Sequence, residues 1–184
     1  MPLPASARNL VLVGFMGSGK SSVGREIARR WGYRFLDTDL AIRQKHGKTI
    51  SEIFESSGEA FFRDEENLAL QHFQASSGAV IATGGGIVLQ LRNRALLRSL
   101  GLVVWLTATE EVIWERVSRN RNRPLLKSDN PRATITSLMT LRNRLYRSVA
   151  DITVETSGLT HQQVADQVVA AVTLWSPGGY ENNH

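Results

Sequence analysis

The feature that most constrains this chain is the glycine-rich segment at residues 14–21, GFMGSGKS. It matches the pattern G-x-x-x-x-G-K-[ST], whose glycines let the backbone wrap closely so that its N–H groups converge on phosphate oxygens. The apolar run Leu10–Val13 precedes the segment, and Lys20–Trp31 follows it with apolar residues at helical spacing. A strand, a phosphate loop and a helix in this order predict a site for a nucleoside triphosphate.

Two side chains of this loop are expected to bind the phosphates and the metal ion. Lys20 is expected to reach the β- and γ-phosphates, and the Ser21 hydroxyl is expected to bind Mg²⁺. The positive end of the following helix dipole adds to anion binding. The predicted ATP-binding residues here are Gly14, Gly17, Ser18, Gly19, Lys20, Ser21 and Ser22. The motif does not by itself identify the acceptor of the phosphoryl group.

Strand-like and helix-like segments alternate along the chain. Short apolar runs predict strands at residues 10–13, 33–36, 79–83, 102–106 and 152–154. Periodicity predicts helices at residues 20–31, 40–46, 56–74, 92–99, 107–119 and 131–147, and from residue 160 onward. Helix starts are predicted from the pairs Ser56 with Glu59, Thr107 with Glu110, and Thr160 with Gln163. The alternation predicts a three-layer α/β/α fold. We expect a five-stranded parallel sheet of the P-loop type, in the order 2-3-1-4-5.

Two aspartates, Asp37 and Asp39, follow the second predicted strand directly. Ligands of a doubly wound sheet bind at the carboxyl ends of its strands, so both carboxylates are expected near the phosphate loop. One can hold Mg²⁺ through water, and the other can accept or orient the proton of an attacking hydroxyl. The plainer alternative is that Asp39 only caps the next helix.

The charge pattern indicates an anionic partner. The formal net charge is +5, and arginine outnumbers lysine by 18 to 4. Between Arg116 and Arg147 the chain has eight arginines, with Asp129 as the only acidic residue. Guanidinium groups bind phosphate or carboxylate through paired hydrogen bonds, so the excess favours shaped recognition of a small anion. A solvated basic face is the alternative interpretation.

Composition narrows the location of the protein. There is no cysteine, which excludes a disulfide framework and a thiolate metal site and fits a reducing compartment. The apolar run Leu10–Val13 is too short for a signal peptide, and no run approaches the roughly 20 residues needed to cross a bilayer. We therefore expect a cytoplasmic protein.

Further motifs, taken in order along residues 8–174, resemble the shikimate kinase family. After the phosphate loop and the pair Asp37 and Asp39, the resemblance rests on Phe54, Phe62-Arg63 with Glu66, the triple glycine 84–86, RPLL at residues 123–126, and Arg142 with Leu145-Tyr146. No single piece is decisive, but the ordered set is specific. The resemblance implies transfer of the γ-phosphoryl group of ATP to the 3-hydroxyl of shikimate, with Mg²⁺, in chorismate biosynthesis.

The resemblance also implies roles for individual residues. Catalysis would involve Lys20, Asp39 and Arg123, with Arg123 meeting the transferring phosphate. ATP would also contact Arg116, stacked on adenine, and Mg²⁺ would lie near Ser21 and Asp37. Shikimate would contact Asp39, Phe54, Phe62, Arg63, Gly84, Gly85, Gly86 and Arg142. Glu66 would hold Arg63 in place.

Two residues depart from the family pattern. Arg144 stands where proline is common, which leaves open whether Arg142 or Arg144 meets the acceptor. Asp64 follows Arg63 where a second basic residue is frequent. Without the family pattern, Arg63 and Arg116 would be read as ordinary surface charges, and the two phenylalanines as core residues.

The expected organisation is a single kinase domain over residues 1–175. Residues 37–66 would bind shikimate, residues 119–131 would form a lid, and residues 176–184 would be a disordered tail. We expect a monomer with small-molecule substrates and no nucleic acid. The alternatives are a gluconate or nucleoside monophosphate kinase of the same fold and, more remotely, a nucleic-acid-binding ATPase.

Overall fold

The computed structural model describes residues 3–4, 7–119 and 130–176. The strands are β1 (Leu10–Val13), β2 (Arg34–Asp37), β3 (Ala79–Ala82), β4 (Leu102–Thr107) and β5 (Ile152–Glu155). The helices are α1 (Lys20–Trp31), α2 (Thr38–His46), α3 (Ile50–Phe73), η1 (Ile87–Leu89), α4 (Leu91–Leu100), α5 (Glu110–Ser118), α6 (Pro131–Val149) and α7 (His161–Leu174), where η1 is a 3-10 turn. Most of the predicted lid, residues 119–131, and of the predicted tail, residues 176–184, lies outside the described residues.

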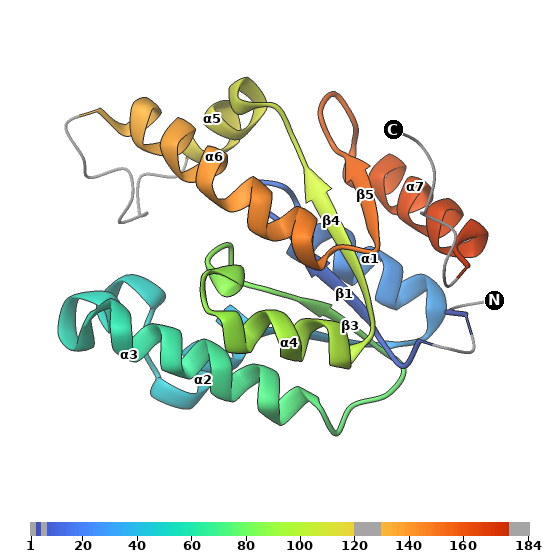
Figure 1. Ribbon diagram of the computed structural model, residues 1–184, viewed down its shortest axis with the longest axis horizontal. Coiled ribbons are helices and arrows are strands. Elements are labelled where there is room, and N and C mark those ends of the chain that lie inside the picture. Colours follow the sequence, from blue (N-terminus) through green and yellow to red (C-terminus); the bar gives the residue numbers. More distant parts are fainter. Residues whose placement is uncertain (1–2, 5–6, 120–129, 177–184) are drawn as a thin grey trace.

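The five strands form one parallel sheet in the order β2-β3-β1-β4-β5, as predicted (Figure 1). Leu12 of β1 pairs with Ala82 on one side, and Val13 pairs with Trp105 on the other. The carboxyl ends of all five strands therefore meet at one edge of the sheet. The loops that follow β1, β2 and β3 carry the phosphate loop, the two aspartates and the triple glycine, so the topology brings them together.

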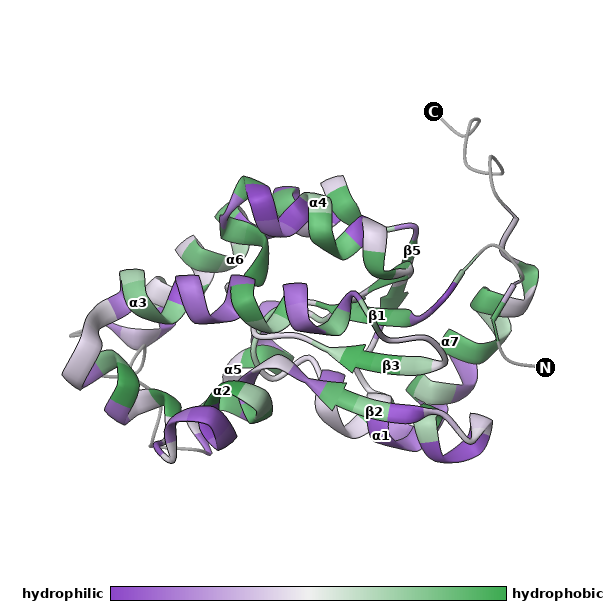
Figure 2. Cartoon of the chain, turned by 90° about the horizontal axis from the view of Figure 1, so that it is seen from below, coloured by the Kyte–Doolittle hydropathy of each residue, from purple (hydrophilic) through white to green (hydrophobic). Residues whose placement is uncertain are grey.

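Helices cover both faces of the sheet in three layers (Figure 1). Leu10 and Leu12 of β1 pack with residues of α1 and α7, whereas Val11 and Val13 point to the opposite face and pack with α3, α4 and α6. In Figure 2, β1 and β3 are coloured as hydrophobic, whereas hydrophobic and hydrophilic residues alternate along α3 and α4. The central strands β1, β3 and β4 are buried on both faces and read as continuous apolar runs, which is why the sequence predicted them within one or two residues.

The start of α3 differs from the prediction. The capping box is made by Thr49 and Glu52, and α3 begins at Ile50 rather than near Ser56. The Ser56 hydroxyl instead donates to the carbonyl of Glu52. Gly58 has φ 81° and ψ 171°, so it interrupts the helix between its two parts. The pair Ser56 and Glu59 imitates a capping box because the second part of α3 starts after Gly58.

Of the other two predicted helix starts, one is wrong and one is confirmed. Thr109, not Thr107, caps α5, because β4 continues to Thr107 and the helix begins only at Glu110. Thr160 and Gln163 form the predicted capping box of α7. In the described part of the chain, no helix is both long and apolar enough to span a membrane.

Candidate active site

The phosphate loop connects β1 to α1 and encloses the Lys20 ammonium group. Lys20 Nζ donates to the carbonyl oxygens of Gly14 and Phe15, both at 2.8 Å, and is 3.5 Å from Ser18 Oγ. Gly19 caps α1 with φ 93°, a left-handed conformation that favours glycine. The ammonium group thus lies at the positive end of the α1 dipole, where an anion is stabilised.

The remaining loop residues lie around this lysine. Gly14 and Gly17 also have positive φ. Ser18 is buried, whereas Ser22 is exposed on the first turn of α1. All seven predicted ATP-binding residues of the loop are therefore grouped at one end of α1.

Asp37 joins the end of β2 to the phosphate loop. Its Oδ2 accepts a 2.7 Å hydrogen bond from the Ser21 hydroxyl. Its Oδ1 accepts from the backbone N–H of Leu40 at 3.1 Å and caps α2. The alternative that Asp39 is the cap is therefore wrong, and α2 begins at Thr38 rather than at Leu40. This leaves Asp39 on the first turn of α2.

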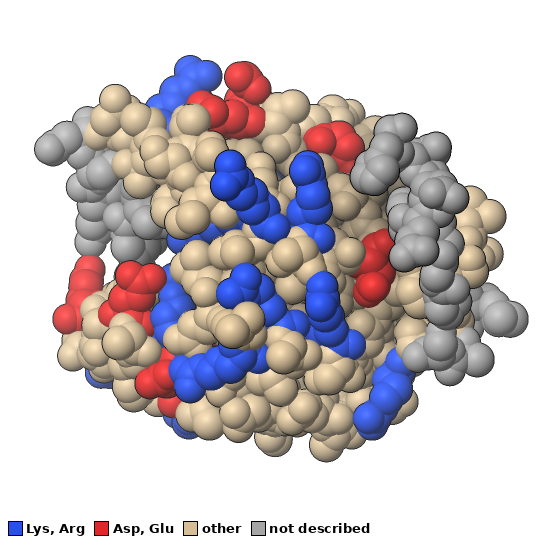
Figure 3. All heavy atoms as spheres, viewed as in Figure 1, with Lys and Arg blue, Asp and Glu red and all other residues tan. Residues whose placement is uncertain are grey.

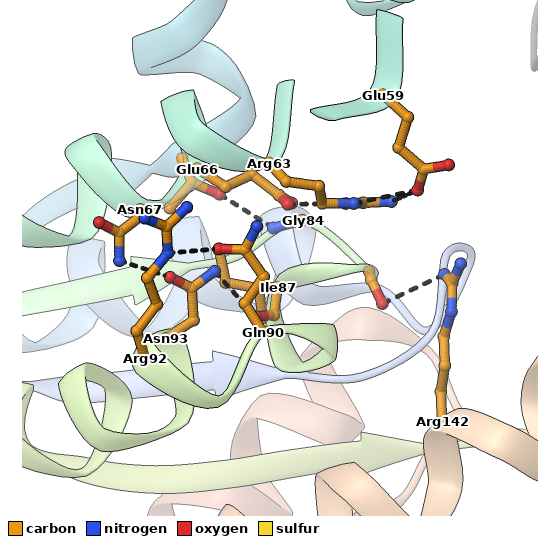
Figure 4. Close-up of polar contacts among 12 residues, drawn as sticks. Glu59, Arg63, Glu66, Asn67, Gly84, Ile87, Gln90, Arg92, Asn93 and Arg142 are labelled. Carbon is orange, nitrogen blue, oxygen red and sulfur yellow. Dashed lines mark hydrogen bonds and ion pairs between the residues drawn. The ribbon is translucent and has the colours of Figure 1, made fainter. Parts of the chain in front are cut away.

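The triple glycine lies at the centre of the acceptor-side residues (Figure 4). A Cβ atom at Gly84 would lie 2.6 Å from Glu66 Oε1 and 2.7 Å from Asp39 Oδ1, and one at Gly86 would collide with the Arg63 guanidinium group. Only glycine permits so close an approach. We call Asp39, Arg63, Glu66 and Arg142, with residues 84–86, the acceptor cluster.

Glu66 is fully buried within this cluster. Burial raises its pKa to about 7; the Arg63 and Arg142 charges act to lower the pKa, and the Asp39 charge acts to raise it. Its Oε2 accepts from Arg63 Nη1 at 2.6 Å, whereas Oε1 has no hydrogen-bond partner among the described residues. Oε1 faces the backbone of Gly84 beside Asp39 Oδ1, so the two carboxyl groups meet at the triple glycine.

Arg63 is held on several sides. Besides Glu66, its guanidinium group donates to Glu59 Oε1 at 2.8 and 3.1 Å. It also lies over the rings of Phe54 and Phe62, 5.9 and 5.4 Å from their centroids. Burial acts to lower the pKa of Arg63, but the two glutamates more than offset it and the pKa is raised. Phe54 and Phe62, predicted to line the shikimate pocket, therefore lie against Arg63, which is predicted to bind the shikimate carboxylate.

Arg142 enters the cluster from α6. Its Nη1 donates to the carbonyl of Gly85 at 3.3 Å, and its guanidinium group lies 5.5 Å from the centroid of the Phe15 ring. Burial lowers its pKa, and its Nε is buried without a hydrogen-bond partner in the described part of the chain. Arg144 is exposed. The structure thus brings Arg142, not Arg144, to the triple glycine.

Arg116 of α5 bridges the phosphate loop and the segment after β5. Its Nη1 donates to the Gly17 carbonyl at 3.1 Å and to Thr156 Oγ1 at 3.2 Å, and Nη2 donates to the Thr156 carbonyl at 3.0 Å. The predicted stacking of Arg116 on adenine stays a prediction. Arg123, predicted to meet the transferring phosphate, lies outside the described residues.

Three residues hold this site together in ways that the sequence analysis did not predict, although it named Tyr146 as part of a motif. Thr38 Oγ1 accepts a 2.9 Å hydrogen bond from the N–H of Gly84. The buried Tyr146 hydroxyl donates to the Gly85 carbonyl. Thr156 anchors Arg116. A threonine between two aspartates and a tyrosine one turn after Arg142 were the available signals, but neither spacing reveals its partner.

Two surface features lie apart from this cluster. Arginines gather over α4 and α6 on one face (Figure 3), and the exposed ones are Arg92, Arg98, Arg132, Arg144 and Arg147. A groove of about 690 Å³ lies between β2, α2 and the second part of α3. It shares only Asp37 with the predicted site, so it does not mark the acceptor position.

The fold and the phosphate loop define the class of this protein as a P-loop kinase. The family model described as shikimate kinase matches residues 16–173. The shikimate kinase of Geobacter sulfurreducens is 48% identical over 172 residues, covering 94% of each chain. The shikimate kinase of Aromatoleum aromaticum is 49% identical over 146 residues, covering 79% of this chain and 83% of that one. This chain belongs to the shikimate kinase family and is an ATP-dependent kinase that uses a divalent metal ion.

A solved structure agrees with this assignment. The shikimate kinase of Acinetobacter baumannii, in complex with shikimate, is 39% identical, with a TM-score of 0.87. The alignment covers 91% of this chain and 94% of that chain.

Proposed function

We propose that this chain transfers the γ-phosphoryl group of ATP to the 3-hydroxyl of shikimate, giving shikimate 3-phosphate and ADP. The observation that carries this proposal is the position of the triple glycine. A Cβ atom at Gly85 would lie 3.1 Å from the N–H nitrogen of Met16 in the phosphate loop, while Gly84 lies against Asp39 and Glu66, and Gly86 lies against Arg63. A phosphoryl donor and an anionic acceptor bound at these two places would be neighbours.

The nucleotide side would be formed by the phosphate loop. Lys20, now held by loop carbonyls, would bind the β- and γ-phosphates. Ser21 and Asp37 offer oxygen ligands of the kind that Mg²⁺ prefers, directly or through water. Bound Mg²⁺ would neutralise charge on the phosphates. Gly14, Gly17, Ser18, Gly19 and Ser22 complete the loop, and Arg116 is proposed to contact adenine.

The acceptor side suits a small hydroxylated carboxylate. Arg63 and Arg142 would bind the carboxylate, and the unpartnered Nε of Arg142 would gain a hydrogen-bond acceptor. Asp39 would accept hydrogen bonds from ring hydroxyls, and backbone N–H groups at residues 84–86 would contribute another. Phe54 and Phe62, whose rings lie 4.7 Å apart, would form an apolar wall.

In the proposed reaction the phosphoryl group passes directly between the two substrates, and the protein forms no covalent bond to it. The acceptor oxygen forms a bond to the γ-phosphorus, the bond from that phosphorus to the β–γ bridging oxygen breaks, and the hydroxyl proton passes to Asp39. The transition state is loose, so catalysis comes from positioning and from positive charge around the equatorial oxygens. Lys20 supplies such charge, and we propose that Arg123 supplies more.

The whole domain is proposed to act as one unit. Residues 1–175 form the kinase domain, with residues 37–66 binding shikimate and residues 119–131 closing over the nucleotide. We further propose a cytoplasmic monomer with small-molecule substrates that binds no nucleic acid.

The test is an ADP-release assay with shikimate, gluconate, AMP and CMP as acceptors, with product confirmed by the mass of one added phosphoryl group. We expect kcat/KM for shikimate to exceed that for each other acceptor by on the order of a hundredfold or more. In Asp39→Asn, kcat should fall by roughly 10²-fold while ATP binding stays near normal. Preferred phosphorylation of gluconate or of a nucleotide would reject shikimate as the substrate.

A further inference from the structure

We propose that two buried asparagines, Asn67 and Asn93, are positioning residues that set the spacing between the two walls of the acceptor cluster. One wall is α3, which carries Arg63 and Glu66. The other is the triple glycine. The inference rests on the proposed function, because its readout is the affinity for the acceptor.

The two asparagines form the middle of a hydrogen-bond relay (Figure 4). Gln71 Nε2 donates to Asn67 Oδ1 at 2.7 Å, Asn67 Nδ2 donates to Asn93 Oδ1 at 2.8 Å, and Asn93 Nδ2 donates to the Ile87 carbonyl at 3.0 Å. Asn67 is 4% exposed and Asn93 is fully buried. The relay therefore runs from exposed Gln71 on α3 through the buried asparagines of α3 and α4 to η1.

Two members of the relay, Asn67 and Ile87, are each next in sequence to a residue of the acceptor cluster. Asn67 follows Glu66, and Ile87 follows Gly86. A displacement of α3 along the relay would move the Glu66 carboxylate, and Arg63 with it, relative to residues 84–86. Other hydrogen bonds tie the glycines to different elements, with Thr38 of α2 at Gly84 and Tyr146 of α6 at Gly85. The relay adds the link to α3.

Hydrogen bonds suit this task better than apolar packing. A side-chain amide has its N–H donors on one atom and its acceptor on another, so the bond from Asn67 Nδ2 to Asn93 Oδ1 fixes the register of the two helices, whereas facing leucines tolerate small slides. Both amides are desolvated, so a displacement that breaks the relay leaves buried polar groups without partners. The position of Arg63 is thereby coupled to the glycine backbone.

The test compares Asn93→Leu with Arg92→Ala. Arg92 also joins α3 to α4, through Asp64, but both side chains are more than half exposed, so this surface pair serves as the matched control. We expect Asn93→Leu to raise the shikimate KM by about tenfold, equivalent to about 1.4 kcal/mol of binding free energy. The ATP KM should change by less than about twofold, because the phosphate loop lies outside the relay. Arg92→Ala should change neither.

A double variant separates positioning from stability. Asn67→Leu with Asn93→Leu replaces the pair by apolar groups, which is expected to recover much of the thermal stability that Asn93→Leu loses. The shikimate KM should stay raised in the double variant. If the KM recovered together with the stability, the asparagines would serve packing only and the proposal would be overturned.

Two further outcomes are decisive. Should Asn93→Leu not fold, Gln71→Ala removes only the outermost donor from an exposed position, and it should raise the shikimate KM by about threefold. An unchanged KM in that variant would overturn the relay. Wild-type protein that phosphorylated no shikimate would reject the proposed function, whereas normal wild-type turnover with an unchanged KM in Asn93→Leu would reject the relay alone.

Discussion

The Ser21 hydroxyl donates a 2.7 Å hydrogen bond to Oδ2 of Asp37, which places the first turn of α1 against the end of β2. Two oxygen-bearing side chains, one from α1 and one from β2, thus meet beside the phosphate loop. Hard divalent cations select such ligands. The proposed metal role of this pair can be tested without disturbing the fold, because Asp37 has a second task that asparagine can perform.

Asp37→Asn should weaken metal binding while keeping the cap of α2, since asparagine caps helices about as well as aspartate. We expect the Mg²⁺ concentration for half-maximal activity to rise by about tenfold or more, with the melting temperature nearly unchanged. Asp64→Asn, at an exposed carboxylate on α3, is the matched control and should leave the metal dependence as it is. An unaltered Mg²⁺ titration in Asp37→Asn would exclude Asp37 from the metal site.

Lys20→Ala should remove most phosphoryl transfer. The ammonium group lies inside the phosphate loop, held by the carbonyls of Gly14 and Phe15, whereas Arg116 contacts the loop at the Gly17 carbonyl instead. We expect kcat to fall by roughly 10²- to 10³-fold, measured by ADP release at saturating shikimate. Lys45→Ala removes a lysine of α2 that pairs with Glu65 of α3 away from the phosphate loop, and it should retain near-normal kcat. Near-normal turnover in Lys20→Ala would reject the proposed role.

The sheet and the phosphate loop were predictable because their signals are local. Buried parallel strands are continuous apolar runs, and the loop motif has a fixed length and fixed glycines. The strand order then follows from the class, and it carries the loops after β1, β2 and β3 to one edge. For these reasons the placement of Lys20, Asp37 and residues 84–86 needed no knowledge of long-range contacts.

The first residues of the helices and the hydrogen bonds between residues far apart in the sequence were less predictable. Ser56 with Glu59 and Thr49 with Glu52 both have capping-box spacing, and the sequence does not say that Gly58 divides α3 in two. The bond from Tyr146 to the Gly85 carbonyl spans 61 residues, and no local pattern encodes it. Arg142 and Arg144 differ only in the face of α6 that carries them, which the packing of α6 decides.

Arg142→Ala should raise the shikimate KM strongly, and Arg144→Ala should not. Arg142 is 5% exposed and donates to Gly85, whereas Arg144 is exposed on the same helix. Loss of one guanidinium partner of a carboxylate costs about 1.5–3 kcal/mol, or roughly 10- to 150-fold in KM. Steady-state kinetics with varied shikimate measures both variants. A large effect in Arg144→Ala alone would mean that the acceptor carboxylate lies elsewhere.

Glu66 couples the acceptor cluster to pH. Burial raises its pKa from 4.5 to about 7, so the folded state keeps a proton that the unfolded chain releases at lower pH. Between these two values the folded state binds more protons than the unfolded state. The contribution of Glu66 to the free energy of unfolding is therefore largest below about pH 4.5, falls as the pH rises towards 7, and is lost above it.

Glu66→Gln should remove this dependence, because glutamine does not titrate. Relative to wild type, the variant should gain roughly 2–3 kcal/mol in the free energy of unfolding between about pH 5 and pH 8, measured by urea unfolding at both values. Glu59→Gln removes the other carboxylate on Arg63 from an exposed position. The difference in the free energy of unfolding between Glu59→Gln and wild type should vary far less with pH. The reason is that an exposed charge is hydrated in the folded and unfolded states alike. If the difference between Glu66→Gln and wild type were the same at both pH values, Glu66 would be charged throughout, and the charges of Arg63 and Arg142 would outweigh the cost of its burial.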